Sequence, residues 1–131
     1  MTLAAANAIR KNQIFGSIGY LRGDNTYDDY DYFSCQVAQG GTLSVEVLPA
    51  STLYSFNNGI SIRNANNTAI NYGYLTTSPV TVTVNDLDAG TYYIRISRAV
   101  GYGAYQINVS GNVILPVNPA PGIFLPLLLS Q

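Results

Sequence analysis

The sequence predicts an all-β protein, an antiparallel β-sandwich of about eight short strands. Several short segments alternate apolar and polar residues with a period of two, as half-buried strands do. Turn-forming Gly, Asn, Asp and Pro residues separate these segments at intervals of roughly eight to twelve residues. No segment has the apolar spacing of a credible helix, so an antiparallel sandwich is favoured over a parallel sheet with crossover helices.

Two C-terminal segments show the clearest strand pattern. Residues 91–97 follow the turn at 85–90, and residues 104–109 follow the turn at 101–103. The alternation places one set of apolar side chains on the buried face: Tyr92, Ile94, Ile96, Tyr105, Ile107 and Val109. Arg95 and Tyr93 fall on the opposite, outward face.

The preceding strands are predicted in the same way. Strands are expected at 14–18, 32–37, 42–47, 60–63, 68–74 and 80–84, and 53–56 is a short apolar segment. Gln39-Gly40-Gly41 separates the second of these from the third, so we expect those two strands to form a hairpin. Their buried faces are predicted to carry Phe33, Cys35, Val37, Leu43, Val45 and Val47.

Composition excludes several classes of function. Only 10% of the 131 residues are charged and the net charge is −1, so no basic stripe is available to neutralise nucleic-acid phosphates. The chain has no His and one Cys, Cys35, which excludes an internal disulfide and a Cys-based zinc site and removes the commonest general base. We therefore expect a protein that is not an enzyme, with Cys35 acting as a small buried apolar residue.

The chain divides into three parts: an N-terminal arm at 1–13, a sandwich domain at 14–112, and a Pro-rich spacer with an apolar tail at 113–131. No apolar run reaches the roughly 18 residues of a spanning helix, so no membrane span is expected. Residues 1–8 lack the basic and long apolar regions of a signal peptide; either export has removed one or the sequence begins at the mature end. Low charge with abundant Tyr, Asn and Thr favours an extracellular or cell-surface location.

The apolar tail is the most unusual feature of the sequence. The residues expected to mediate self-association are the apolar ones of this tail: Ile123, Phe124, Leu125, Leu127, Leu128 and Leu129. Exposed to water, such a run is a sticky patch. Three interpretations stay open: insertion into a neighbouring copy as in donor-strand complementation, docking on its own sandwich, and a sorting or membrane-contact tail.

An acidic loop is the candidate metal site. Asp24, Asp28, Asp29 and Asp31 offer the hard oxygen ligands that calcium prefers, and calcium is the only cofactor expected. Their spacing matches no EF-hand. The alternative is that these carboxylates cap and solvate a turn.

Aromatic residues suggest a polysaccharide surface, since aromatic faces stack on sugar rings. The outward or loop candidates are Tyr27, Tyr30, Tyr32, Tyr72, Tyr74, Tyr93 and Tyr102. The alternative is that these rings pack on neighbouring strands or at a protein interface. Asn66 begins an N-glycosylation sequon in a predicted loop.

Four segments together resemble the bacterial pre-peptidase C-terminal (PPC) domain family: 29–33, 38–45, 89–96 and 103–109. The resemblance spans roughly residues 14–110. It implies a jelly-roll-like sandwich, exported and non-catalytic, of a kind appended to secreted peptidases or surface proteins. Some relatives bind calcium or collagen.

Two functions are expected from these observations. The first is a structural protein that self-associates through its terminal arms into a surface fibre or sheath, because a heterologous contact that does not close yields filaments. The second is an accessory binding or secretion module that attaches a secreted enzyme to polysaccharide or extracellular protein.

Overall fold

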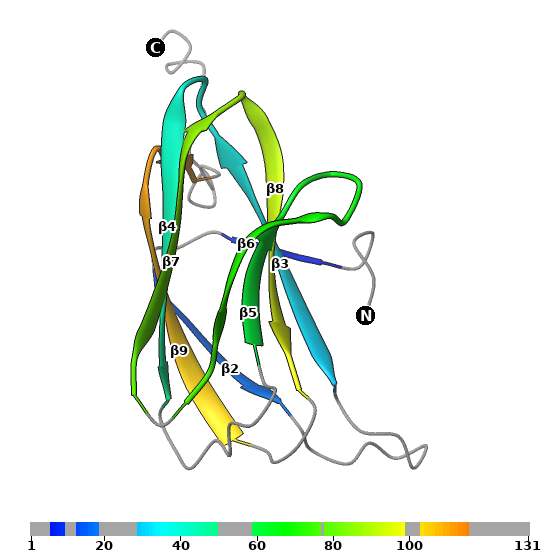
Figure 1. Cartoon of the computed structure of the whole chain (residues 1–131), viewed down its shortest axis with the longest axis vertical. Helices are drawn as coiled ribbons and strands as arrows, with labels where there is room; N and C mark the ends of the chain where they lie inside the picture. The colour runs from blue at the N-terminus through cyan, green and yellow to red at the C-terminus, as the bar shows by residue number, and fades with distance from the viewer. Residues whose placement is uncertain are drawn as a thin grey trace, which may run out of the picture.

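The computed structural model describes residues 6–9, 13–18, 29–49, 59–76, 78–98 and 103–115, and every structural statement below concerns these residues. They contain no helix. Ten strands form two sheets packed face to face, and eight of these strands, β2 to β9, are five residues or longer (Figure 1). The predicted antiparallel sandwich is confirmed. The short apolar segment at 53–56 lies outside the described residues.

One sheet, called sheet A, has the order β1-β3-β8-β5-β6, with β10 also pairing with β3. Its strands are β1 (Asn7–Ala8), β3 (Tyr30–Val37), β5 (Gly59–Arg63), β6 (Ala69–Tyr74), β8 (Gly90–Ser97) and β10 (Val113–Ile114). Sheet B has the order β2-β9-β4-β7. Its strands are β2 (Gln13–Ile18), β4 (Gly41–Pro49), β7 (Val80–Leu87) and β9 (Gly103–Gly111). All pairings between these strands are antiparallel except that of β1 with β3.

The hairpin predicted between 32–37 and 42–47 is wrong, because β3 and β4 belong to different sheets. β3 pairs along its whole length with β8, whereas β4 pairs with β9 and β7. The short turn between them carries the chain across the core, so their two apolar faces meet each other instead of lying side by side. This change of sheet between consecutive strands gives the fold its jelly-roll-like topology.

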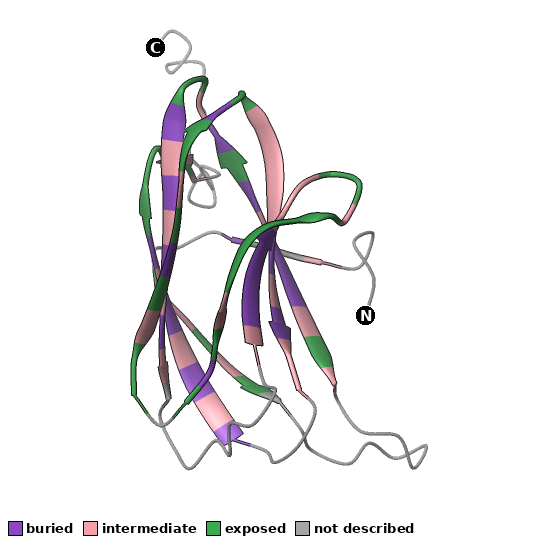
Figure 2. Ribbon diagram, in the orientation of Figure 1, coloured by how far each residue is buried: buried purple, intermediate pink, exposed green. Residues whose placement is uncertain are grey.

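The core lies between the inner faces of the two sheets (Figure 2). The predicted inward faces of β3, β4 and β9 are buried, and so are Ile94 and Ile96 of β8, while Tyr92 is only partly buried. β7 continues to Leu87, past its predicted end at residue 84. A bulge opposite β4 places Asp86 at φ 56° and allows Leu87 to reach the core.

A polar contact also joins the two sheets within this core. The hydroxyl of Tyr105 on β9 donates a hydrogen bond to the carboxylate of Asp31 on β3. Gly16 on β2 makes room for the Tyr105 ring, since a Cβ at this position would lie 2.5 Å from its Cζ atom.

No described helix is long and apolar enough to cross a membrane.

Candidate binding site on the outer face of sheet A

The outer face of sheet A is built from cross-strand rows of side chains. In the central row, Tyr32 of β3 pairs with Arg95 of β8, Arg95 with Ser61 of β5, and Ser61 with Tyr72 of β6. The next row runs in the same way through Tyr30, Ser97, Gly59 and Tyr74. The third row runs through Ser34, Tyr93, Arg63 and Ala69. Tyrosines therefore stand at both ends of two rows, with small and cationic residues between them.

This arrangement leaves a hollow of about 250 Å³ over β5, β6 and β8. Its lining includes Ser61, Arg63, Tyr72, Tyr74, Arg95 and Ser97. The hollow exists because Ser97 and Gly59 are small, whereas the residues at the two ends of their row are tyrosines. We call the outward residues Tyr30, Tyr32, Ser61, Arg63, Tyr72, Tyr74 and Arg95 the Tyr–Arg face.

Arg63 is held in place by the turn between β5 and β6. Its Nε donates to the Asn67 side-chain oxygen at 2.6 Å, and its Nη2 donates to the Asn67 carbonyl at 2.7 Å. Its Nη1 donates to the Ser61 hydroxyl at 3.1 Å. Asn67 adopts a φ of 62°, which Asn tolerates better than most residues. Neutral groups thus hold the Arg63 guanidinium in the lining of the hollow.

Arg95 is positioned by aromatic rings. Its Cζ lies 5.0 Å from the centroid of the Tyr30 ring, a cation–π distance, and it donates a hydrogen bond to Tyr32. Its buried Nε has no hydrogen-bond partner among the described residues. Among the described residues, neither Arg63 nor Arg95 forms an ion pair. Arg98, which follows the end of β8, does pair with Asp29, at 2.8 Å.

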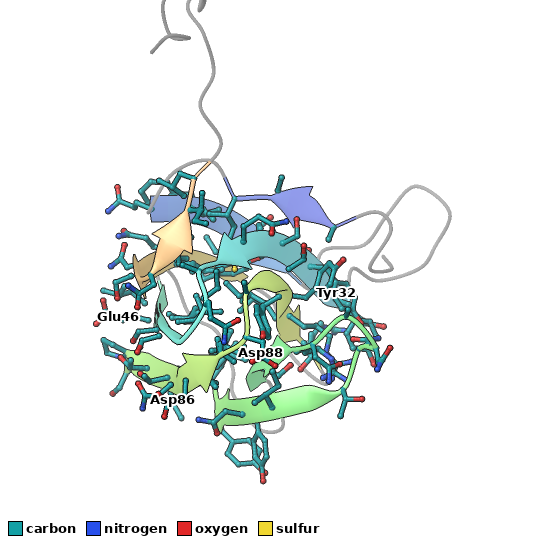
Figure 3. The ribbon with its side chains drawn as sticks, turned by 90° about the horizontal axis from the view of Figure 1, so that it is seen from above. Tyr32, Glu46, Asp86 and Asp88 are labelled. Carbon is teal, nitrogen blue, oxygen red and sulfur yellow. The ribbon has the colours of Figure 1, made fainter. Side chains whose placement is uncertain are left out.

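The two guanidinium groups create a positive site. Burial lowers the pKa of Arg63, and the charge of Arg95 lowers it further. Burial also opposes ionisation of Tyr32, but hydrogen bonds from Arg95 and Asn67 and the charges of both arginines outweigh it, so the pKa of Tyr32 is lowered. The outward strand positions of sheet A that the structure describes carry no carboxylate. Figure 3 shows Tyr32 on the opposite side of the sandwich from Glu46 and Asp86 of sheet B.

The structure places five of the seven candidate tyrosines. Tyr30, Tyr72 and Tyr74 are exposed; Tyr72 and Tyr74 have 64% and 63% of their surface accessible, and their rings meet edge to face at 6.0 Å. Tyr93 is partly buried, and Tyr32 is only 5% exposed although it lies on the outward face. Tyr27 and Tyr102 lie outside the described residues.

The predicted calcium ligands are not brought together in the described part of the chain. The carboxylate of Asp29 pairs with Arg98, and that of Asp31 accepts the Tyr105 hydroxyl. Asp24 and Asp28 lie outside the described residues, as does the apolar run at 123–129. No cluster of three or more metal-ligating side chains occurs among the residues that are described. Calcium binding by this loop stays a prediction.

Asn66 and Cys35 occupy well-defined positions. Asn66 is exposed in the turn after β5, where its backbone N–H donates to the Asn64 side chain at 2.9 Å. The Cys35 thiol is buried, and burial raises its pKa to about 12, so it is protonated and unreactive at neutral pH.

Sequence reasoning missed the two arginines of the site. Alternation did place Arg63 and Arg95 on polar faces, but it gave no reason to consider them together. The available signal was that two of the six basic residues occupy outward positions in strands with no acidic residue two positions away.

Comparison with known proteins identifies the domain. A profile of the bacterial pre-peptidase C-terminal domain matches residues 29–98, more than half of the chain. The fold is similar to the pre-peptidase C-terminal domain of a Bacillus anthracis collagenase, with a TM-score of 0.61 and 23% identity, covering 80% of this chain and 94% of that one. It is also similar to PliG of Aeromonas hydrophila, a periplasmic inhibitor of g-type lysozyme, with a TM-score of 0.57 and 15% identity over 81% of this chain and 95% of that one.

No curated protein sequence matches the chain. The two structural similarities concern the fold, and the profile match covers β3 to β8, which include the strands that build the Tyr–Arg face. It also includes three of the four segments that carry the resemblance: 29–33, 38–45 and 89–96. The chain belongs to the bacterial pre-peptidase C-terminal domain family.

Proposed function

We propose that this chain is a non-catalytic binding module of an exported protein, and that the Tyr–Arg face attaches it to an extracellular polymer. The observation that carries this proposal is the hollow on sheet A, which combines two exposed tyrosines with two arginines that meet no carboxylate among the described residues. A concave site with a few convergent polar groups is typical of ligand binding. The PPC domain is a non-catalytic module, and the similar domain from Bacillus anthracis is part of a collagenase.

Retention on insoluble polymers tests this proposal. Full-length protein should be retained by at least one of a panel of insoluble polysaccharides and collagen. The double variant Tyr72→Ala/Tyr74→Ala should bind about tenfold more weakly or worse, because each exposed ring supplies contact area and stacking energy. Phe15→Ala is the matched control, since Phe15 is an aromatic residue of sheet B with 70% of its surface exposed.

The outcomes are distinct. Equal retention of wild type and the Tyr72→Ala/Tyr74→Ala variant, or retention of neither, contradicts the proposal. Loss of binding in Phe15→Ala as well would place the binding surface on sheet B or show a non-specific effect of aromatic removal, and so contradicts it too.

Self-association through the C-terminal segment is the second proposal. It is favoured by the position of β10, which pairs with Val37 and Gln36 at the edge of β3 and leads the chain toward residues 116–131 from that edge. An apolar segment that adds a strand to a sheet edge in a second copy would link molecules head to tail.

Deletion of residues 116–131 tests self-association. Light scattering should detect assemblies of the full-length protein and monomers of the truncated protein. If both are monomers at the same concentrations, assembly through the tail is excluded, whereas polymer binding by the Tyr–Arg face is unaffected.

A further inference from the structure

Two like charges lie on one small surface with no counter-charge among the described residues. The cross-strand rows place Arg95 beside Ser61, and Arg63 two residues further along the same strand as Ser61, so both guanidinium groups line the same hollow. Like charges at short range repel, and partial burial removes the water that would screen them. In the described part of the chain neither group meets a carboxylate, and the Arg95 Nε has no acceptor at all.

The donors that remain point to the class of ligand. Each guanidinium carries five N–H groups in a fixed planar fork. Arg63 uses its Nε and one bond from each of Nη1 and Nη2, which leaves an N–H on each terminal nitrogen. The fork of an arginine matches the two oxygens of a carboxylate or a sulfate group.

The surroundings favour an anion carried on a sugar ring. Tyr72 and Tyr74 are exposed residues of the lining, and their rings provide apolar surface in the same hollow as the two arginines. The volume of about 250 Å³ is below the range of drug-sized pockets and suits one ring with its substituents. Ser61 and Ser97 add hydroxyl groups to the lining, which suit the hydroxyls of a carbohydrate.

We infer that the hollow on sheet A binds the oxyanion, carboxylate or sulfate, of one residue of an acidic polysaccharide, with Arg63 and Arg95 as its ligands and Tyr72 and Tyr74 against the ring. This inference rests on the proposed function and specifies the chemistry of the polymer. A bound oxyanion carries one negative charge and would offset part of the positive charge of the two arginines, and it would accept hydrogen bonds from the N–H groups that Arg63 leaves unused.

Binding of soluble polymers by the full chain tests the inference. The probes are polygalacturonate for carboxylate, dextran sulfate for sulfate, and neutral dextran. Calorimetry or affinity electrophoresis should detect binding of at least one anionic polymer and none of neutral dextran, and the affinity should fall as salt is added. The oxyanion is identified as the one whose polymer loses affinity when Arg95 is replaced by Gln.

Three variants assign the binding to the site. Arg95→Gln should weaken binding about tenfold to a hundredfold, the expected loss for a charge-assisted hydrogen bond. Arg95→Lys should recover part of the affinity, because it keeps the charge but not the fork. Arg98→Gln removes the same charge from a guanidinium that is already paired with Asp29, and should leave the affinity unchanged. Thermal melting of each variant establishes that it is folded.

The failure of this inference differs from the failure of the proposed function. Equal binding of anionic polymers by wild type and a folded Arg95→Gln variant overturns the anion site. Binding of neutral dextran as strongly as polygalacturonate overturns it too. In either case, a loss of polymer retention in the Tyr72→Ala/Tyr74→Ala variant would still support a binding module. If this variant is retained as well as wild type, both the proposed function and the anion site are contradicted.

Discussion

Tyr32 shows how neighbouring charges change the chemistry of an outward-facing residue. It lies on the polar side of β3, yet it is 5% exposed and accepts hydrogen bonds in a network with Arg95 and Asn67. Hydrogen bonds to the ionised form and nearby positive charges both favour the phenolate. The pKa of the Tyr32 phenol therefore reports the positive potential that the two arginines create.

We expect Tyr32 to ionise below the usual tyrosine pKa of 10.0. Below pH 10, Tyr32→Phe should therefore lose more tyrosinate absorbance relative to wild type than the removal of a tyrosine with the usual pKa would cause. In Arg95→Gln the Tyr32 titration should move to higher pH, because the largest favourable partner is gone. Identical titration curves for wild type and Tyr32→Phe below pH 10 would contradict this assignment.

The buried thiol of Cys35 makes the free energy of unfolding depend on pH in the alkaline range. Burial raises the pKa of its thiol to about 12, whereas an unfolded thiol ionises near 8.5. Above about pH 8.5 the unfolded chain releases this proton and the folded chain keeps it, so the free energy of unfolding falls as pH rises toward 12.

Replacing Cys35 by Ala should remove this pH dependence. In wild type, the contribution of Cys35 to the free energy of unfolding falls by at most about 1.4 kcal/mol for each pH unit between about 8.5 and about 12. Urea unfolding at about pH 8 and about pH 10 measures the loss in both proteins, and tyrosine ionisation, which is common to both, cancels in the comparison. Parallel losses in wild type and Cys35→Ala would show that Cys35 does not contribute.

At the level of the elements, the turn between β9 and β10 depends on one glycine. Gly111 has a φ of 102°, and a Cβ there would lie 2.1 Å from the carbonyl oxygen of Thr42. Asn112 follows and exchanges hydrogen bonds with Thr42, donating to its carbonyl at 2.7 Å and accepting from its N–H at 2.8 Å. The close approach of these backbones is what brings β10 back to sheet A.

Gly111→Ala should therefore destabilise the fold more than a comparable change elsewhere. Gly40→Ala is the control, because Gly40 also has a positive φ, 72°, but a Cβ added to it would meet no described atom within 4 Å. We expect about 1 kcal/mol for Gly40→Ala and about 2 kcal/mol more for Gly111→Ala, from the added steric clash. Chemical denaturation measures both, and equal losses would show that the turn relaxes without cost.

At the level of the whole molecule, the two sheets are held together by apolar packing and by the contact between Tyr105 and Asp31. Tyr105 is fully buried, and its hydroxyl crosses the core from sheet B to a carboxylate of sheet A. Asp31 is partly buried, and hydrogen bonds to charged groups are worth more than hydrogen bonds between neutral groups.

Tyr105→Phe should lower the free energy of unfolding by about 1.5 to 3 kcal/mol. Tyr92→Phe is the control, because the Tyr92 hydroxyl donates at 2.8 Å to an exposed backbone carbonyl, that of Asp88, and its loss should cost about 0.5 to 1.5 kcal/mol. Urea unfolding measures both. A smaller loss for Tyr105→Phe than for Tyr92→Phe would mean that the inter-sheet contact adds little.

Much of the fold could be predicted because a strand's period of two is a local property. The inward faces of β3, β4 and β9 were evident from alternation alone, and so were Ile94 and Ile96. The partner of each strand was not, since alternation is the same whether two strands pair in one sheet or face each other across the core. The predicted hairpin between β3 and β4 failed for this reason.

The candidate site was predicted only in part. The tyrosines of the outward face were identified from their strand positions, but Arg63 and Arg95 lie 32 positions apart in the sequence, and nothing local connects them. Their meeting depends on the register of β5 with β8, which pairs Ser61 with Arg95. That register is set by long-range backbone pairing and by burial of the opposite faces.

The sequence by itself therefore determined the class of the fold, the buried face of most strands and membership of a non-catalytic family, because these depend on local periodicity and short motifs. The tertiary structure decided which strands pair and in which register. That alignment places Tyr32, Arg95, Ser61 and Tyr72 in one row, from four strands, and so creates a positive hollow that no single segment of the chain contains.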